Sequence, residues 1–561
     1  MILRNNLQKN LFLVFYLVAV TYFVLRNTKQ TYGVNDDVII QSWLSGAYTG
    51  DPEPMIRGSA TPKILFGYIL SNLYKLFPFV NWFTIIILVF TLFSWFLIGQ
   101  VAIKLNQIGI FLFFLFISFL HLFWFIPAPT YTACAVLLAF SILLRILNIH
   151  LNSNRNLIIL SLIYAFAYLI RPESFFFGSL ALVPFLVKKF VSNKKFQIKL
   201  ILFFFVTLIV IAFDYSVENN FYKNDKNWNE YKKLETARYK IQANRIESEL
   251  MNNPKKYDWT ESEAKLFEQY ITLDTVIFNE SRYNLLINNL KYNSNKFNLN
   301  DYFVIGYKNL INSDINWEWF NLGKLIPTSW LFFAFIFWPR IGKFFMLTSL
   351  SFLLVFFAMI YVSYFLRQPE RVQVSAIFVT ILIPFIFSTF YTEEKIEKLD
   401  FGIKGIQYII LFLIVMFCVP QIQYLNKKYA GANNVFWLKE RDTLSEFPPN
   451  SIFVGNASQF RNNWTNPYLM QQSEVEERIF TLGWHNYSPH WKTRASKLGL
   501  NPQNMWDSII NNKNVYFVSD KDTFNYILEF LNNQEILFKD VKNVRSIDFV
   551  GNDYSVWKFS N

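Results

Sequence analysis

Two adjacent carboxylates, Asp36 and Asp37, closely follow the first apolar run of the chain, which extends from Leu11 to Leu25. Ionised carboxylates beside a hydrocarbon layer are energetically costly, and membrane proteins usually keep them for function. A carboxylate within hydrogen-bond reach of a hydroxyl group can accept its proton as a general base. The pair therefore predicts acid–base chemistry next to a membrane surface.

Charged side chains interrupt the apolar runs at two later places. They are Arg171 and Glu173, on either side of a proline, and Arg367, Glu370 and Arg371. A guanidinium group binds phosphate through two parallel hydrogen bonds and keeps its charge when partly buried. An acid pair facing such arginines suits the attack of a hydroxyl group on a carbon that carries a lipid phosphate. The cations would stabilise the departing phosphate.

Each of these groups also has a structural interpretation that the sequence leaves open. Asp36 could cap the helix that follows it. Arg171 could pair with Glu173 at the end of a span, and Arg367 and Arg371 could anchor another span at the interface.

Membrane spans are the elements that position these groups. The chain has 561 residues, of which 53% are hydrophobic and 19% aromatic. Its apolar runs reach the roughly 20 helical residues that cross a hydrocarbon core of about 30 Å. We predict about eleven spans: 10–26, 80–103, 108–127, 130–149, 156–171, 174–189, 197–215, 322–339, 344–366, 372–391 and 403–425. The segments 156–171 and 174–189 are short and could be tilted or partly re-entrant.

The distribution of Lys and Arg orients these spans. With the N-terminus in the cytoplasm, the inner loops carry about twice as many basic residues as the short outer loops, as cytoplasmic loops do. An odd number of spans then puts the C-terminus outside. All the charged groups above and two polar segments, 216–321 and 426–561, fall on this outer side. The net charge of +13 is spread over the loops, so no nucleic-acid surface is expected.

The outer segments have elements of their own. In the loop 27–79, two stretches, 38–48 and 62–77, show the apolar spacing of short amphipathic helices that lie on a membrane surface. The segment 216–321 is predicted to be mainly helical. Within it, the charged stretch 228–250 is interpreted as a helix with a solvated face, packed on the membrane domain.

The composition becomes that of a soluble domain from about residue 426. Strands are predicted at 451–455, 478–483, 514–520, 544–550 and 554–559, and helices at 504–512 and 522–532. The predicted fold is therefore mainly α: a polytopic membrane domain, 1–425, followed by a small extracytoplasmic α/β domain, 426–561.

Metal chemistry is not favoured. His485 and His490 lie five residues apart in a loop rich in Trp and Tyr, without an evident third ligand, so a sugar-stacking or packing surface is the preferred interpretation. Asp51 and Glu53 are each followed by proline in a turn and offer no clear third acid beside the Asp pair. We expect no cofactor, although a divalent metal remains chemically compatible with the acid pair.

The order and sidedness of these motifs resemble the GT-C superfamily of integral-membrane glycosyltransferases. These proteins have many spans, an acidic motif in the first extracytoplasmic loop and, often, a C-terminal soluble domain. The resemblance covers most of the chain. It implies an inverting transfer of a hexosyl or pentosyl group from a polyprenyl-phosphate donor to a glycan, lipid or protein acceptor.

The resemblance also implies roles for particular residues. It makes Asp36 or Asp37 the catalytic base and leaves the choice between them open. Binding of the donor phosphate falls to Arg171, Arg367, Arg371 and Arg238, with Glu173 and Glu370 as supporting residues. Arg238 is otherwise a solvated helix residue.

Three other classes of function remain open. They are a flippase or transporter of lipid-linked glycans, an oligosaccharide ligase or polymerase that uses a lipid pyrophosphate, and a non-catalytic membrane scaffold. Transporters often carry charges at the membrane midplane and symmetric broken helices, which are not evident in this sequence.

Overall fold

The computed structural model describes most of the chain. The described residues are 6–32, 35–54, 62–105, 108–148, 154–243, 246–293, 304, 320–365, 370–391, 423, 442–456, 466–470, 477–549 and 552–560. Apart from residue 423, the predicted span 403–425 lies outside them, as do Arg367 and the predicted domain boundary at 425/426.

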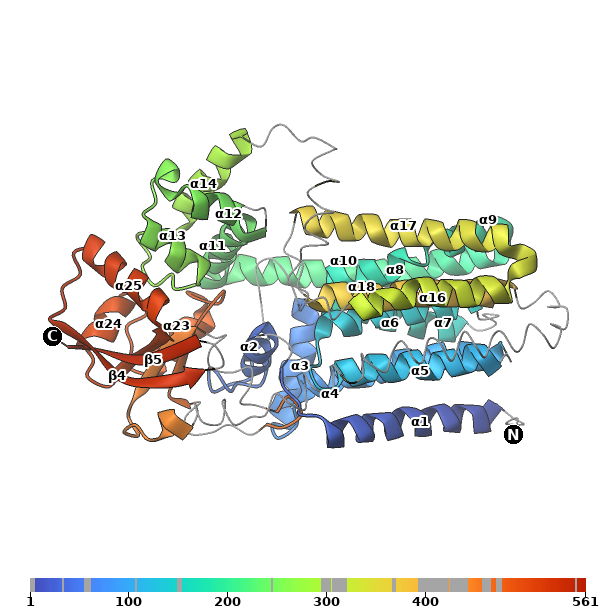
Figure 1. Ribbon diagram of the computed structural model, residues 1–561, viewed down its shortest axis with the longest axis horizontal. Coiled ribbons are helices and arrows are strands. Elements are labelled where there is room, and N and C mark those ends of the chain that lie inside the picture. Colours follow the sequence, from blue (N-terminus) through green and yellow to red (C-terminus); the bar gives the residue numbers. More distant parts are fainter. Residues whose placement is uncertain are drawn as a thin grey trace.

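A bundle of long apolar helices forms one end of the molecule (Figure 1). Its helices are α1 (Asn6–Asn27), α4 (Trp82–Lys104), α5 (Ile108–Phe125), α6 (Tyr131–Asn148), α7 (Asn154–Ile170), α8 (Pro172–Leu180), α9 (Val183–Ser192), α10 (Lys194–Asn224), α16 (Phe320–Ile336), α17 (Ile341–Phe365) and α18 (Glu370–Tyr391). A short 3-10 helix, η3 (Trp338–Arg340), precedes α17. Every predicted span except 403–425 coincides with a described helix or helix pair.

Seven of the described helices are long and apolar enough to cross a membrane, or eight when the bent pair α8 and α9 counts as one span. The break between α8 and α9 bends them by 60°, in line with the expectation that this region is irregular. α7 is a shorter apolar helix. The chain is therefore a multi-pass membrane protein, and the predicted fold class is confirmed.

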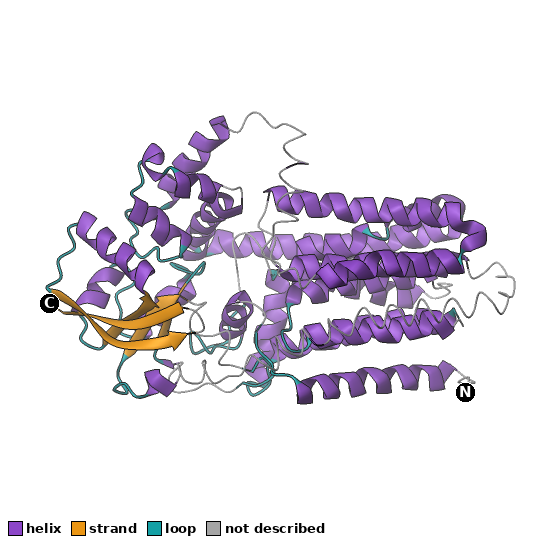
Figure 2. Cartoon of the chain, viewed as in Figure 1, coloured by secondary structure: helices purple, strands orange, loops and turns teal. Residues whose placement is uncertain are grey.

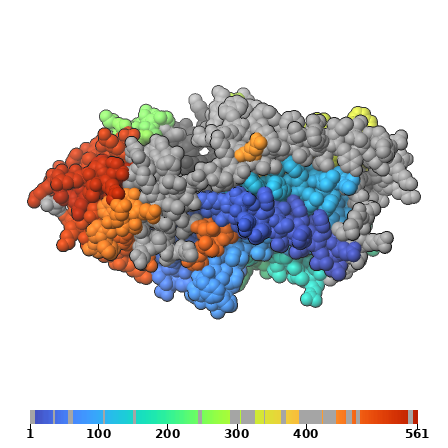
Figure 3. All heavy atoms as spheres, turned by 60° about the horizontal axis from the view of Figure 1, so that its bottom comes forward, coloured from blue at the N-terminus to red at the C-terminus, as the bar shows by residue number. Residues whose placement is uncertain are grey.

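The remaining elements gather at one end of the bundle, called the domain end below (Figure 1). They are α2 (Asn35–Leu44), α3 (Ile64–Leu76), α11 (Lys226–Ala243), α12 (Ile246–Asn252), η1 (Pro254–Tyr257), α13 (Glu261–Glu268), α14 (Glu280–Asn293) and the C-terminal sheet. The N-terminus lies at the opposite end of the bundle (Figure 1). In the space-filling view, residues of the blue N-terminal part run along the bundle and the red C-terminal part forms the far end (Figure 3).

The two predicted surface helices differ in burial. α3 keeps an apolar outer side, since Ile69 is 42% and Leu76 is 68% exposed. α2 is enclosed instead: Ile40, Trp43 and Leu44 are fully buried. The expectation of a surface-lying helix is therefore wrong for α2, because the C-terminal domain covers it.

Helices α11 to α14, here called the helical insert, share a hydrophobic core with the C-terminal domain. Ile241, Leu250 and Phe267 belong to the same buried cluster as Val454 and Phe517 of the sheet. The interpretation that the charged helix packs on the membrane domain is thus incomplete, since much of its apolar surface packs on the C-terminal domain.

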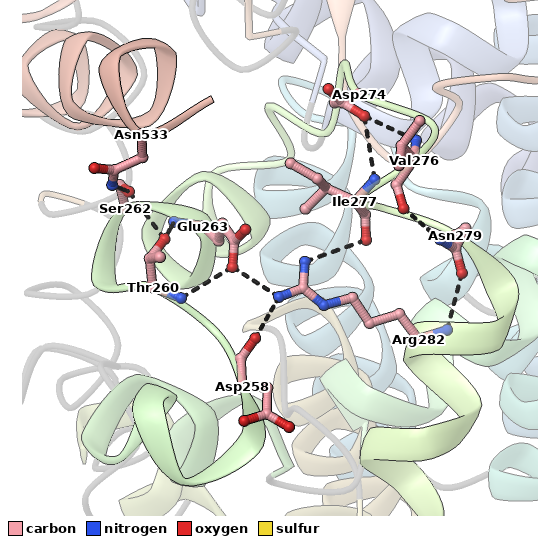
Figure 4. A network of polar contacts seen from close by, with 10 residues as sticks. All are labelled: Asp258, Thr260, Ser262, Glu263, Asp274, Val276, Ile277, Asn279, Arg282 and Asn533. Atoms are coloured by element: carbon pink, nitrogen blue, oxygen red, sulfur yellow. Dashed lines mark hydrogen bonds and ion pairs between the residues drawn. The ribbon is translucent and has the colours of Figure 1, made fainter. Parts of the chain in front are cut away.

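A polar network ties the start of α13 to α14 in the helical insert. Thr260 caps α13, with its hydroxyl accepting from the Glu263 amide at 3.1 Å and its amide donating to Glu263 Oε2 at 2.9 Å. Arg282 of α14 donates to the same carboxylate at 2.8 Å (Figure 4). Thr260 and Glu263 therefore form a capping box, and the ion pair ties α13 to α14.

A five-stranded mixed sheet forms the C-terminal domain (Figure 2). Its strands are β1 (Ile452–Asn456), β2 (Ile479–Leu482), β3 (Val515–Asp520), β4 (Asp540–Phe549) and β5 (Asn552–Ser560), in the order β2-β1-β3-β5-β4. β1 pairs in parallel with β2 and β3, whereas β5 pairs antiparallel with β3 and β4. The helices are α23 (Pro489–Lys497), α24 (Met505–Asn511) and α25 (Lys521–Asn533). The predicted strands and helices are confirmed.

A short segment of the C-terminal part, 466–470, touches the domain ends of several spans. Tyr468 donates from its hydroxyl to the Ile126 carbonyl at 2.9 Å, and Asn81 donates to the Pro467 carbonyl at 2.6 Å. This segment thus ties the C-terminal part of the chain to the ends of α4 and α5.

Candidate active site at the domain end of the bundle

Both acids of the Asp pair lie in the first turn of α2. The positive end of the helix dipole favours negative charge at this position. The two side chains differ in exposure, with Asp36 at 21% and Asp37 at 0%. Adjacent residues on a helix point about 100° apart, which places one acid at the rim of the site and the other inside the protein.

Asp37 is a buried carboxylate without a hydrogen bond. Neither of its oxygens has a hydrogen-bond partner within the described part of the chain. Burial raises the pKa of Asp37 well above its usual value, and the charge of Arg371 opposes that rise. The neighbouring charge of Asp36 raises the pKa further, while Arg171 lowers it. Buried polar groups are nearly always paired, so an orphaned carboxylate suggests a functional role.

Asp36 pairs with Arg371, which lies in the first turn of α18. The distance from Arg371 Nη2 to Asp36 Oδ2 is 3.5 Å, and the arginine is 13% exposed. This contact joins α2 to α18, 335 positions further along the chain. Asp36 is therefore neutralised by a cation that also faces Asp37.

Arg171 enters the site from the junction of α7 and α8. It is the N-cap residue of α8, with φ −161° and ψ 105°, followed by Pro172. Proline disfavours the helical conformation in the residue before it, so the chain turns here and α7 ends. The Arg171 side chain donates from Nη1 to Thr132 Oγ1 at 2.6 Å and lies 5.1 Å from the Tyr131 ring centroid. Its Nε is 3.7 Å from Glu173 Oε2.

The structure thus brings Asp36 and Asp37 of α2 together with Arg171 at the α7–α8 junction and Arg371 of α18. Glu173 adjoins them through Arg171, while Arg367 and the Glu370 side chain lie outside the described residues. The catalytic and phosphate-binding roles of these residues stay predictions.

Sequence reasoning missed Thr132 and Tyr131, which hold the Arg171 side chain. Both lie at the start of α6 and face the bundle interior, with exposed fractions of 0% and 1%. The only local signal was a polar pair at the beginning of an apolar run, which usually marks no more than a span end.

Arg238 lies apart from this group, in α11. It is 2% exposed, pairs with Glu235 and donates to the Trp484 carbonyl. The interpretation as a solvated helix residue is therefore wrong. Arg238 joins α11 to the C-terminal domain, and its predicted contact with a donor phosphate stays a prediction.

His490 lies in an aromatic cluster behind α2. Its ring centroid is 4.4 Å from that of Trp43 and 4.9 Å from that of Trp228. Burial lowers the pKa of His490 to about 3, so its Nδ1 contact with Glu53 Oε2 at 3.2 Å is made by a neutral imidazole near pH 7. His485 is also fully buried. Of the two interpretations of this loop, packing fits and an open sugar-stacking surface does not.

No group of three or more His, Cys, Asp or Glu side chains that could hold a metal ion occurs among the described residues. Metal-independent chemistry stays a prediction.

Comparisons with known proteins give one structural similarity. No protein-family model matches the chain, and no curated protein matches it. The chain is similar to the crystal structure of ArnT from Cupriavidus metallidurans bound to undecaprenyl phosphate, with a TM-score of 0.47 and 10% sequence identity over 97% of each chain. A structural similarity does not by itself establish a function.

Proposed function

We propose that the chain is an inverting membrane glycosyltransferase of the GT-C type. It moves a sugar from a polyprenyl-phosphate donor to a hydroxyl group of a glycan, lipid or protein acceptor on the extracytoplasmic face. The observation that carries this proposal is Asp37: a fully buried carboxylate with no hydrogen-bond partner among the described residues, near the charges of Arg171 and Arg371.

Asp37 is the better candidate for the base. Because burial raises its pKa, its carboxylate is a stronger proton acceptor than an ordinary aspartate. Its oxygens accept no hydrogen bond from another described residue, so their capacity to accept one from a hydroxyl group is unused. Asp36 is held by Arg371 and is better suited to positioning that cation.

The proposed reaction is a single displacement. The acceptor oxygen attacks the anomeric carbon of the donor while its proton passes to Asp37. The bond from that carbon to the phosphate oxygen breaks, and polyprenyl phosphate leaves with the electron pair. Arg171 and Arg371 stabilise the negative charge that develops on the leaving phosphate.

The test measures release of polyprenyl phosphate by the purified protein, given a polyprenyl-phosphate sugar and a crude envelope acceptor. Asp37→Asn should lower turnover by about 10²–10⁴-fold, the usual contribution of a general base. Asp36→Asn should lower it less, by about tenfold, because Arg371 is displaced but not removed. Asp522→Asn, an exposed first-turn acid of α25, is the matched control and should change nothing.

Three outcomes would replace the proposal. Full turnover by Asp37→Asn would exclude Asp37 as the base. Release of polyprenyl pyrophosphate would indicate the ligase or polymerase alternative. Movement of intact lipid-linked glycan across a vesicle membrane, without cleavage, would indicate a flippase.

A further inference from the structure

A pocket lined mainly by lysine and other polar side chains lies at the domain end, apart from the Asp pair. It has a volume of about 570 Å³ and lies between the last two turns of α10, one face of α11 and the start of α14. Its charged lining residues are Lys223, Lys232, Lys233, Lys240 and Glu280. The excess of cations makes it suited to an anion, and its size is within the range of pockets that bind small molecules.

Most of this positive charge is not neutralised by the protein. Lys232 pairs with Glu218 at 3.4 Å, which also pairs with Lys63 at 3.1 Å. In contrast, Lys223, Lys233 and Lys240 form no ion pair with any residue that the structure describes. A bound anion would supply the missing partner.

Tyr222, which also lines the pocket, has a hydroxyl group that lacks a hydrogen-bond partner in the part of the chain that the structure describes. The residue is only 5% exposed, and its hydroxyl has no hydrogen-bond partner among the described residues. Lys232 Nζ lies 3.8 Å from the centroid of its ring. A buried hydroxyl without a partner needs an explanation, and a ligand oxygen in the pocket provides one.

The position of the pocket along α10 indicates the source of the anion. Ile201, Leu208 and Tyr215 are 60%, 60% and 65% exposed and recur every seven residues, so they share one outward face of the helix. Tyr222 is seven residues beyond Tyr215 and continues that face. A lipid chain lying along this apolar face would therefore end at the pocket.

The depth of the pocket fits the lipid headgroups. Tyrosine is enriched at the border of the hydrocarbon core, which is where Tyr215 ends the apolar face. Asn219, the first lining residue, lies about 6 Å beyond Tyr215 at a rise of 1.5 Å per residue. The headgroup layer is about 5–8 Å thick on each side of a bilayer.

We propose that this pocket binds the phosphate of an anionic lipid whose acyl chains lie along α10. The unpaired lysines contact the phosphate, the Tyr222 hydroxyl donates to one of its oxygens, and neutral side chains such as Asn229 and Thr236 face the hydroxyl groups of the headgroup. The lining residues include neither the Asp pair nor Arg171 or Arg371. Contact of α11 with α2 is made by Trp228, which does not line the pocket and lies 6.3 Å from Trp43, ring centroid to ring centroid.

The experiment measures binding of fluorescent phosphatidylglycerol and phosphatidylcholine to the full-length protein in detergent. The double variant Lys233→Gln/Lys240→Gln should weaken binding of phosphatidylglycerol roughly twentyfold, since each lysine near anionic lipid contributes about a fivefold effect. Binding of phosphatidylcholine should stay as weak as before. Tyr222→Phe should weaken binding of phosphatidylglycerol about threefold through loss of one hydrogen bond.

A matched control removes the same charge outside the pocket. Lys226→Gln/Lys255→Gln alters two exposed lysines of the helical insert that do not line it. An equal loss of phosphatidylglycerol binding in this control would overturn the proposal, as would unchanged binding in the Lys233 and Lys240 double variant. If inorganic phosphate displaces the lipid at equal concentration, the ligand is a free phosphate and not a lipid. Unfolding temperatures of all variants show whether each is folded.

Discussion

Two buried carboxylates of this protein differ in their hydrogen bonding and ion pairing. Glu263 in the helical insert is 5% exposed, accepts from the Thr260 amide and pairs with Arg282 (Figure 4). Asp37 in α2 is fully buried, and its oxygens have no hydrogen-bond partner among the described residues. The first arrangement stabilises a fold, whereas the second leaves the hydrogen-bonding capacity of a carboxylate unused. The difference separates a structural carboxylate from a candidate catalytic one.

The first comparison tests whether the cations near Asp37 serve catalysis. Arg371→Gln should reduce kcat about 10²–10³-fold, the range seen when one group that stabilises transition-state charge is removed. Arg171→Gln should fall in the same range. Rates of polyprenyl phosphate release measure both. Lys265→Gln, which removes a surface cation of the insert, is the control. Activity near wild type in either arginine variant would remove that residue from the phosphate site.

The next prediction concerns the contribution of the paired carboxylate, Glu263, to stability. Glu263→Gln should lower the free energy of unfolding by about 2 kcal/mol, because it weakens charge-assisted hydrogen bonds to Thr260 and Arg282. Turnover per folded molecule should not change. Unfolding followed by tryptophan fluorescence gives the stability. A large loss of activity in folded protein would show that the insert network takes part in catalysis.

A smaller change in the free energy of unfolding, of opposite sign, is expected when the unpaired carboxylate is replaced. Asp37→Asn should raise the free energy of unfolding by about 1 kcal/mol near neutral pH, because a buried charge is removed. Since the pKa of Asp37 is raised in the folded state, the wild-type protein loses stability as the pH rises from the ordinary aspartate pKa through the raised one. The gain should disappear in acid, where wild-type Asp37 is neutral. Lower stability in the Asn variant at every pH would mean that Asp37 is structural.

The features that were predictable from the sequence are those with local signals. Long apolar runs determine the spans, short continuous runs of β-branched and aromatic residues mark β1 and β3, and Thr260 with Glu263 marks the start of α13. Alternation of the spans across the bilayer was enough to bring Asp36, Arg171 and Arg371 to the same end of the bundle. These arguments need no knowledge of tertiary contacts.

The enclosure of α2 could not be predicted in this way. Trp43 is buried by Trp228 and Trp484, which lie far along the chain. No residue near Trp43 in the sequence indicates these contacts. The same holds for Arg238, whose partner is a carbonyl group of the C-terminal domain. Burial that depends on distant segments is also what distinguishes Asp37 from Asp36, and so the choice of base required the structure.

The pH dependence of kcat/KM tests the central claim, that the unpaired Asp37 is the general base, most directly. The acidic limb of the profile should lie above the usual range of aspartate, because activity is lost as Asp37 is protonated at its raised pKa. Asp36→Asn should move this limb to lower pH and Arg371→Gln to higher pH, since the first removes a charge that raises the pKa and the second a charge that lowers it. An acidic limb at the ordinary aspartate value that neither variant moves would contradict the account.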